Sequence, residues 1–216
     1  MPAFNSLPPR WRPQVADLQA RLGPPLIRTV PLGHNSYLQH ATRSAREAEV
    51  CFVLQRPTGR LLVMRKTFYP PGIFRLPTGG VQPGEGALEA LAREIGEETG
   101  LQTVAQRFLA WIGYAAEAGQ APAFCTFAFL VREVAGHLQP RDPREQVEAF
   151  GEVAPADLLQ IAGRLEGLSA GYSGDLGARW EDWGRFRAVA HRAVWEALTA
   201  RGGGVAPPRS DTGAGG

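Results

Sequence analysis

Residues 79–101 have the sequence GGVQPGEGALEALAREIGEETGL, and this stretch decides the fold. Its first part is rich in glycine, which lets a backbone turn sharply and approach a ligand closely. Its second part predicts a helix over residues 86–99, because its apolar residues recur at helical spacing. That apolar stripe consists of Leu88, Leu91, Ala92 and Ile95. Gly100 follows, as expected of a residue that ends a helix, so the segment predicts a glycine-rich loop leading into a helix.

Three glutamates mark one face of this helix. Glu94, Glu97 and Glu98 stand at i, i+3 and i+4, so their carboxylates converge. Like charges at that spacing destabilise a helix by roughly a few tenths of a kcal/mol per pair, and a hard divalent cation would reverse the sign of the interaction. Clustered carboxylate oxygens suit Mg²⁺ or Mn²⁺. A solvated acidic face is the alternative, but the glycine-rich entry to the helix favours a metal site.

The spacing of the fixed residues is more specific than the glutamates alone. From Gly79 the segment follows the pattern G-x5-E-x7-R-E-U-x-E-E-x-G-U, where U is aliphatic, with Glu85 and Arg93 ahead of the glutamates. All nine specified positions are filled. Seven fixed residues would match by chance at roughly 10⁻⁸ per window. The segment therefore resembles the Nudix box.

This resemblance implies a fold and an activity. The expected fold is α+β, a Nudix-type α/β/α sandwich with a mixed sheet, in which the box forms a loop-helix-loop motif. The implied enzyme is a pyrophosphohydrolase that cleaves the diphosphate bond of a nucleoside diphosphate linked to another moiety. Its cofactor would be Mg²⁺ or Mn²⁺, and its partner a small-molecule nucleoside diphosphate derivative.

By the same resemblance, Glu94, Glu97 and Glu98 bind the metal. The backbone carbonyl of Thr78 or Gly79 is expected to add a further ligand. The ion pair between the matching Glu and Arg of the family orients the helix, a role that falls here to Glu85 and Arg93. Glycines are expected to shape the loop and the end of the helix, and these are Gly79, Gly80, Gly84 and Gly100.

The general base is left open between two places in the chain. In some family members it is the first glutamate of the box run, here Glu94, and in others a glutamate from a loop after the box. Glu145 and Glu148 are the better loop candidates, and Glu117 is a further one; plain surface charge is the alternative for each. The expected catalytic residues are thus Glu94 and Glu98 in the box and Glu145 and Glu148 in the loop.

Residues near the box are candidates for substrate binding. Arg65 and Arg75, with Lys66, precede the box and have the charge to hold phosphate oxygens. Phe74 and Trp111 are near enough in sequence to stack on a base. Further aromatic candidates are Phe68, Tyr69 and Tyr114. Solvated surface for the cations and core packing for the aromatics are the alternatives.

The composition restricts the class of protein. The chain has 216 residues, 44% hydrophobic and 20% charged, which is ordinary for a globular protein, and no run of 18 apolar residues predicts a membrane span. Prolines occupy the N-terminus where a signal peptide needs apolar residues. Cys51 and Cys125 lie in apolar runs without a metal or disulfide spacing. A cytoplasmic protein is expected. The net charge of +2 neither demands a nucleic-acid partner nor excludes an anionic small ligand, and no nucleic-acid partner is expected. Lys66 is the single lysine beside 22 arginines.

The apolar pattern predicts the organisation of the chain. Helices are expected over residues 11–22, 156–163 and 180–200, and strands over residues 26–31, 49–54, 60–66, 107–114 and 121–134. The second and third of these strands are expected to form a hairpin, as are the fourth and fifth. Residues 34–47 are expected to form a loop or a weak edge element, and residues 137–149 and 171–179 are expected to be loops. The chain then divides into an N-terminal extension (1–46), a Nudix core (47–163), a C-terminal helical extension (164–201) and a disordered tail (202–216).

Two other functions remain as alternatives. A Nudix-fold module that senses a nucleotide without cleaving it would often lack a box glutamate, and this chain has them all. An isopentenyl-diphosphate isomerase would need a catalytic cysteine before the box, where Cys51 is predicted to be a buried strand residue. The C-terminal helix is expected to pack on the core. A homodimer contact or a lid is the alternative for that helix.

Overall fold

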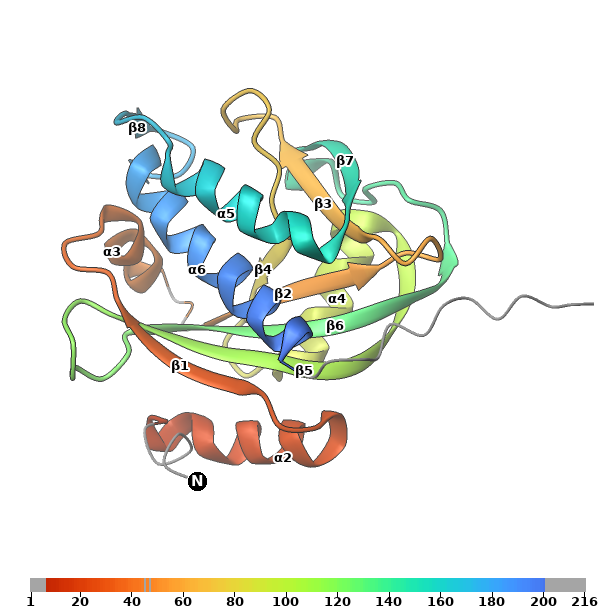
Figure 1. The fold of residues 1–216 in the computed structure, drawn as a ribbon, viewed down its shortest axis with the longest axis horizontal. Helices are drawn as coiled ribbons and strands as arrows, with labels where there is room; N and C mark the ends of the chain where they lie inside the picture. The colour runs from red at the N-terminus through yellow and green to blue at the C-terminus, as the bar shows by residue number, and fades with distance from the viewer. Residues whose placement is uncertain (1–6, 45, 47, 201–216) are drawn as a thin grey trace, which may run out of the picture.

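A computed structural model describes residues 7–44, 46 and 48–200 of the chain. Within them, one large mixed sheet lies between two layers of helices (Figure 1). The strands are β1 Leu26–Pro31, β2 Ala48–Gln55, β3 Leu61–Lys66, β4 Thr78–Gly80, β5 Leu101–Ala115, β6 Phe124–Gly136 and β7 Val147–Val153. The fold is α+β, as the resemblance implied.

The sheet is mixed because it contains both parallel and antiparallel strand pairs. The strand order among the described residues is β1-β5-β6-β2-β3-β7, with β4 also paired to β2. The pairs β1·β5 and β2·β6 are parallel, and the others are antiparallel. This order puts β4, which begins the box, directly beside the central strand β2.

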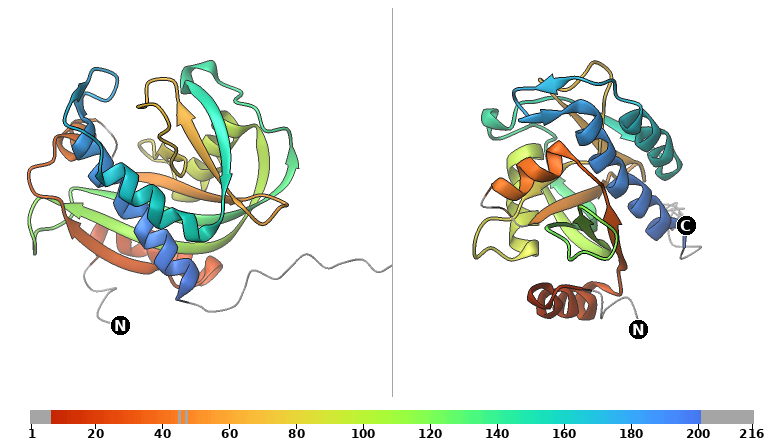
Figure 2. Two further views of the ribbon diagram at one scale, coloured as in Figure 1. Left: turned by 45° about the horizontal axis from the view of Figure 1, so that its top comes forward. Right: turned by 90° about the vertical axis from the view of Figure 1, so that its left-hand side faces the viewer.

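The two faces of the sheet bury two separate apolar clusters, as the period of a strand requires. In β2, Cys51 and Val53 point into one cluster, and Val50, Phe52 and Leu54 point into the other. The first cluster is covered by α3 Ser36–Arg43, α5 Leu158–Glu166 and α6 Trp180–Thr199. The second is covered by α2 Arg12–Leu22 and α4 Ala87–Thr99, so that α4 and α6 lie on opposite sides of the sheet (Figure 2).

The C-terminal helix α6 lies against α5 over the sheet (Figure 1). Gly184 allows this close approach, because a Cβ there would stand 2.0 Å from the backbone oxygen of Leu165. Trp183 and Phe186 of α6 are buried in the same apolar cluster. The C-terminal helix therefore packs on the core.

Helix α3 and strand β7 lie where the sequence predicted loops, or for α3 a weak edge element. Residues 34–47 contain α3, whose amide of Leu38 donates to the Asn35 side chain over 2.9 Å. The carboxylate of Asp182 in α6 accepts from the amide and the hydroxyl of Ser36 over 2.9 and 2.7 Å. An eight-residue helix is marginal alone, so these contacts with α6 stabilise it. Likewise β7 forms within residues 137–149 and beyond, because β3 pairs with it along its length.

Of the two predicted hairpins, the structure contains one and not the other. The pair β5·β6 forms a long hairpin as predicted, although β5 begins earlier, at Leu101. β2 and β3 share only the pair Gln55↔Leu61, so the predicted hairpin between them opens at once and each strand pairs elsewhere. Residues 171–179 hold a small sheet of β8 Tyr172–Ser173 and β9 Ala178–Arg179. The predicted tail, 202–216, lies outside the described residues.

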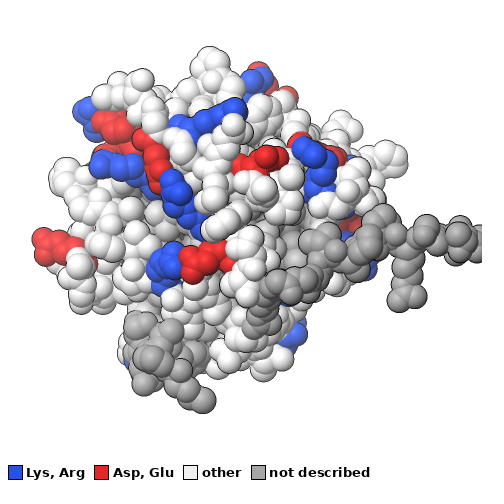
Figure 3. Space-filling model, viewed as in Figure 1, with Lys and Arg blue, Asp and Glu red and all other residues white. Residues whose placement is uncertain are grey.

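Three short 3₁₀ helices complete the described elements, η1 Pro9–Trp11, η2 Pro143–Glu145 and η3 Pro155–Asp157. No helix in the described ranges combines the length and apolarity needed to cross a bilayer. Acidic and basic side chains lie next to one another in small groups on the face drawn in Figure 3. That face therefore shows mixed charge rather than a continuous basic stripe.

Candidate metal and phosphate site

The box forms β4, a loop and helix α4, as its pattern predicts. At the start of α4 the amide of Gly86 donates to Glu89 Oε2 over 2.8 Å, which satisfies one of the free amides of a helix terminus. At the end, Gly100 adopts a left-handed conformation with φ 69°, which glycine tolerates best. The helix is thereby fixed at both ends, next to the sheet.

The two glycines of β4 make room for charged side chains. A Cβ at Gly79 would lie 1.9 Å from Cδ of Glu94, so the Glu94 carboxylate occupies the space that any other residue would fill. A Cβ at Gly80 would lie 2.7 Å from the Arg46 side chain. Gly79 therefore makes room for a buried carboxylate, whereas beside Gly80 the exposed Arg46 side chain is able to shift aside.

Arg93 links the loop to the helix. Its Nε and Nη2 donate to the two oxygens of Glu85, each over 2.8 Å, and Nη2 also donates to the Gly80 carbonyl over 2.8 Å. Its Nη1 donates to Glu94 over 2.8 Å and to Glu97 over 3.0 Å. The hydrogen bond with Glu85 raises the pKa of Arg93, and the same bond lowers the pKa of Glu85. This is the geometry that a bracing role for Glu85 and Arg93 requires.

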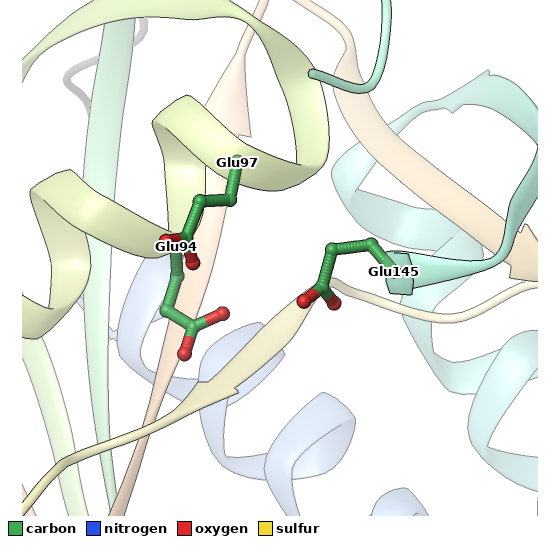
Figure 4. Close-up of side chains that lie close together, drawn as sticks. All are labelled: Glu94, Glu97 and Glu145. Carbon is green, nitrogen blue, oxygen red and sulfur yellow. The ribbon is translucent and has the colours of Figure 1, made fainter. Parts of the chain in front are cut away.

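Three carboxylates from two elements meet next to Gly79. Oxygens of Glu94, Glu97 and Glu145 lie within 4.8 Å of one another, and Figure 4 shows the side chains pointing toward a common centre. Glu94 and Glu97 come from α4, and Glu145 ends the 3₁₀ helix η2 on the opposite side. The next residue, Gln146, has φ 54°, a left-handed conformation that costs a non-glycine residue roughly 1 kcal/mol. The backbone thus accepts strain where it presents Glu145.

Glu98 lies apart from this cluster, deeper in the protein. Its side chain is 0% exposed, and burial raises its pKa to about 7. Lys66 Nζ lies 2.9 Å from one Glu98 oxygen and 3.0 Å from Glu145 Oε2. Burial alone would lower the pKa of Lys66, but Glu98, Tyr69 and Glu145 together outweigh burial and the pKa is raised.

The donor set fits a hard divalent cation. Neither oxygen of Glu98 has a hydrogen bond of good geometry in the described part of the protein, although Lys66 Nζ lies 2.9 Å from one of them. Burial raises the pKa of Glu94 as well, although Arg93 opposes this. Buried carboxylates without enough partners are costly, and carboxylate oxygens are the ligands that Mg²⁺ and Mn²⁺ prefer. The residues present could therefore hold such an ion.

Glu94 and Glu145 line a cleft of about 470 Å³. One half is built by the box and its neighbours, and includes Lys66, Arg75, Thr78, Gly79, Gly80, Glu94 and Glu145. The other half is built by the chain on either side of the core, and includes Tyr37, His40, Asp175, Leu176, Trp183 and Arg187. The extensions that sequence patterns left without a role thus form one wall of the cleft.

Arg75 lies in this cleft, 3% exposed. Its Nε donates to the Tyr69 hydroxyl over 2.6 Å, and its Nη1 donates to the carbonyl of Leu76 and the hydroxyl of Thr78. Among the described residues, Nη2 has no hydrogen-bond partner and no carboxylate lies within ion-pair distance of Arg75. A buried guanidinium without a carboxylate is suited to an anionic ligand.

Helix α6 also fixes the segment that leads into β4. The Leu76 amide donates to His191 Nε2 over 3.0 Å, so Nδ1 carries the proton and donates to the Arg187 carbonyl over 2.9 Å. Burial lowers the pKa of His191 to about 4, so the imidazole is neutral. No role was predicted for this histidine, because its spacing to other residues carries no signal in the sequence.

A buried ion pair joins α6 to β2 beneath the cleft. Arg187 Nη1 donates to both oxygens of Glu49 over 2.7 Å, and Nη2 donates to the Tyr37 hydroxyl over 2.6 Å. Thr126 donates to Glu49 over 2.8 Å. This network was not predicted, because its members are far apart in the chain. The only signal was a charged residue, Glu49, at the start of an apolar strand.

The structure does not bring every predicted residue to the cleft. Arg65 donates to Glu148 over 2.7 Å and lies over the Phe74 ring, and Phe74 lines a different cavity beside α5. Trp111 is fully buried in the core, so its ring has no free face for a base. The predicted substrate roles of Arg65, Phe74 and Trp111, and the predicted catalytic role of Glu148, therefore lack the geometry that they need.

Cys51 does not have the surroundings of a catalytic thiol. It is 0% exposed, and burial raises its pKa to about 12. A thiol in that state is neither accessible nor ionised at neutral pH. The isomerase alternative therefore has no support from this residue.

Comparison with known proteins finds the family. A NUDIX domain model matches residues 45–169. Nudix hydrolase 6 of Arabidopsis thaliana is 39% identical over 66 residues, a match that spans 29% of this chain and 23% of the plant protein.

Solved structures with a similar fold include an ADP-ribose pyrophosphatase from Streptococcus suis, at 18% identity and TM-score 0.45, covering 73% of this chain and 95% of that one. They also include a UDP-X diphosphatase at 15% identity and TM-score 0.48, covering 73% of this chain and 64% of that one. A C. elegans Ap4A hydrolase has 20% identity and TM-score 0.41, covering 60% of this chain and 92% of that one. Because the family model matches more than half of the chain, and its box forms the predicted loop and helix, the chain belongs to the NUDIX domain family.

Proposed function

We propose that this Nudix protein hydrolyses the diphosphate bond of a nucleoside diphosphate linked to a further group, with Mg²⁺ or Mn²⁺ as cofactor. One observation carries the proposal. The carboxylates of Glu94, Glu97 and Glu145 lie within 4.8 Å of one another, and Glu94 and Glu145 line the same cleft as the buried guanidinium of Arg75. A site for a cation therefore adjoins a site for an anion, as a metal-bound diphosphate requires.

The metal ligands would be Glu94, Glu97 and Glu145, with Glu98 and the Thr78 carbonyl as further oxygen donors. A bound divalent cation supplies neutralisation of the charge on phosphate oxygens and a lowered pKa for bound water. Arg93 keeps Glu94 and Glu97 pointing to the same place through its Nη1. Gly79 keeps the space next to Glu94 open to the cleft.

The phosphates would be held by two arginines on the other side of the cluster. The free Nη2 of Arg75 is available to donate to a phosphate oxygen, while the three hydrogen bonds of its Nε and Nη1 fix the guanidinium. Arg46 reaches the cleft across Gly80. Charge-assisted hydrogen bonds of this kind are among the stronger polar contacts of a binding site.

For the general base we infer Glu145. Its carboxylate faces the cluster from outside the helix, and its ion-pair partner is a flexible lysine. Glu94 already accepts a hydrogen bond from Arg93, and Glu148 is paired with Arg65 away from the cleft lining. One oxygen of Glu145 would bind the metal, and its second oxygen would be left to take a proton from water attacking a phosphorus.

The group linked to the diphosphate would lie in the half of the cleft that the extensions build. That half presents polar groups, the Tyr37 hydroxyl, the His40 imidazole and the Asp175 carboxylate. A small-molecule substrate fits a cleft of about 470 Å³. The two buried cysteines are compatible with the reducing cytoplasm, where we place the protein.

A metal-dependent activity screen tests the proposal. The purified protein is incubated with sugar nucleotides, dinucleoside polyphosphates, nucleoside triphosphates and coenzyme A, with Mg²⁺, Mn²⁺ or EDTA. We expect turnover of at least one compound class, and its loss in EDTA. Products are identified by phosphorus NMR in ¹⁸O-water, which locates the bond that is cut. Nucleotide binding by calorimetry without any product would instead favour a sensing module.

The loop glutamates supply a matched pair of variants. Glu145→Gln should lower kcat by about 10²–10⁴-fold, the usual range for a general base. Glu148→Gln removes a charge three residues away that lies outside the cleft lining, and it should leave kcat unchanged. Equal effects of the two substitutions would refute the assignment of Glu145.

A further inference from the structure

The chain has 22 arginines and one lysine, and the lysine lies in the candidate site. In a chain that otherwise uses arginine for its positive charges, lysine at this one position suggests a requirement that arginine does not meet. Lysine carries a compact point charge on a flexible stem, whereas the guanidinium of arginine is a broad planar fork. The requirement would therefore be for a small cation that is able to move.

Lys66 is held between carboxylates from two elements. Its Nζ lies 2.9 Å from Glu98 Oε1 and 3.0 Å from Glu145 Oε2. Glu98 is fully buried, and neither of its oxygens has a hydrogen bond among the described residues. The pairing of β3 with β7 shifts register between Arg65 and Lys66, as bulges next to functional sites often do. The ammonium thus occupies the space between a box glutamate and the loop glutamate.

Arg65 provides an internal comparison. It is the neighbour of Lys66 on β3, and it also pairs with a glutamate of the 145–148 segment, Glu148, over 2.7 Å. That pair lies outside the lining of the cleft. Two adjacent cations therefore make similar pairs, and the lysine is the one that faces the metal ligands.

We propose that Lys66 is an internal cation that alternates with the divalent metal. Without metal, its ammonium offsets the repulsion between Glu98 and Glu145. When metal binds, Glu145 and Glu98 turn their oxygens to the ion, and the ammonium moves off them into the cleft that it lines. This inference rests on the metal site of the proposed function, and it adds a residue whose position depends on that metal.

Lys66 and the metal ion would compete because both contact the Glu145 carboxylate. Glu145 belongs both to the carboxylate cluster and to the pair with Lys66. A divalent ion bound to the cluster and an ammonium in contact with the same carboxylate repel each other at short distance, where little water screens them. The lysine side chain has a flexible four-carbon stem, so the ammonium is able to leave without a change in the backbone.

The single lysine allows a direct measurement on the unaltered protein. Protein labelled with ¹⁵N-lysine gives one side-chain ammonium signal, which belongs to Lys66. Without metal, the ammonium protons should exchange slowly with water, since the group is held between two carboxylates. With saturating Mg²⁺ the signal should be lost to fast exchange. A signal that persists while calorimetry shows Mg²⁺ binding would overturn the proposal.

A second experiment measures the cost of the competition. Lys66→Met keeps the length of the side chain and removes its charge, and Arg65→Met is the matched control on the same strand. Lys66→Met should bind Mn²⁺ about tenfold more tightly than the wild type. Its melting temperature should rise more on Mn²⁺ addition than that of the wild type, while Arg65→Met should match the wild type in both respects. Equal Mn²⁺ affinity in Lys66→Met and Arg65→Met would refute the alternation.

The two experiments also separate this inference from the proposed function. Calorimetry without substrate reports whether Mg²⁺ binds, and absence of binding would reject the metal site and the alternation together. Binding without movement of Lys66 would reject the alternation and leave the hydrolase intact. Movement of Lys66 in a protein that turns over no substrate would support the alternation while rejecting the hydrolase.

Discussion

The two halves of the cleft are built in different ways. The half with the glutamates comes mainly from one continuous segment, β4 and α4, in which a single arginine, Arg93, joins the loop to the helix. The half that faces it comes from α3, the β8–β9 turn and α6. More than a hundred residues of core separate α3 from the other two elements. The first half depends on local spacing, and the second depends on contacts between distant segments.

This difference suggests that the two halves of the cleft have different roles, one in turnover and one in stability. Carboxylates placed by helical periodicity keep the same mutual arrangement wherever the helix packs, so the proposed metal site depends mainly on local structure. The facing wall depends on how α6 is held on β2 and on the segment before β4, through Arg187 and His191. Substitutions in the first half should therefore affect turnover, and substitutions in the second should affect stability.

The largest expected effect is on the box side. Glu98→Gln removes a buried charge at similar shape, and we expect kcat to fall about 10³-fold, equivalent to about 4 kcal/mol. Glu89→Gln is the control on the same helix, since it keeps an oxygen to accept from the Gly86 amide, and kcat should not change. Steady-state kinetics on the substrate found by the screen measures both. Full activity of Glu98→Gln would show that this carboxylate is only a counter-ion for Lys66.

The next largest effect is expected on stability, from a substitution in the facing half of the cleft. Arg187→Met leaves the Glu49 carboxylate buried with Thr126 as its remaining described side-chain donor, and it should lower the free energy of unfolding by about 3 kcal/mol. Arg192→Met is the matched control on α6, because its pair with Glu166 is exposed on both sides. That change should cost less than about 1 kcal/mol. Urea unfolding measures both, and similar losses would show that the buried pair does not hold α6.

The smallest expected effect sharpens the role of His191 through its pH dependence. The folded protein lowers the pKa of this group from 6.5 to about 4, so the folded state disfavours the protonated form. Its contribution to stability is therefore present above pH 6.5 and is lost as the pH falls toward 4. Between pH 7 and pH 5 the free energy of unfolding of the wild type should fall by about 2 kcal/mol more than that of His191→Gln.

Glu98 acts in the opposite direction in the metal-free protein. Its folded pKa is raised from 4.5 to about 7, so its contribution is present below pH 4.5 and is lost as the pH rises through 7. Both proteins in the comparison carry Glu98, so the difference between their slopes isolates His191. Parallel pH profiles of the two proteins would contradict a buried neutral imidazole at this position.

The elements that sequence patterns predicted well are long and periodic. Helices α4 and α6 have apolar stripes that continue over several turns, and β6 is an extended apolar run. Helix α3 was missed because it is short, and its stability comes from Asp182 in a distant helix. Strand β7 was missed because its pattern is weak, and pairing with β3 decides its conformation.

The candidate site divides along the same line. Glu94 and Glu97 could be placed together from their spacing, because helix geometry fixes neighbours three residues apart. Glu145 and Glu148 could not be told apart, since only the left-handed turn at Gln146 and the pairing of β7 decide which one faces α4. Arg65 and Phe74 were expected near the substrate, yet Arg65 pairs with Glu148 and Phe74 lines another cavity.

The sequence by itself determined the family and the chemistry of one helix face, because the glycines, the arginine and the glutamates act through contacts within about twenty residues. Only the tertiary structure decided which loop glutamate joins them, that the single lysine stands between two carboxylates, and that the two extensions form the opposite wall. The physical reason is the range of the interactions. Helix periodicity is fixed by the local backbone, whereas buried ion pairs and sheet pairing depend on where distant segments meet.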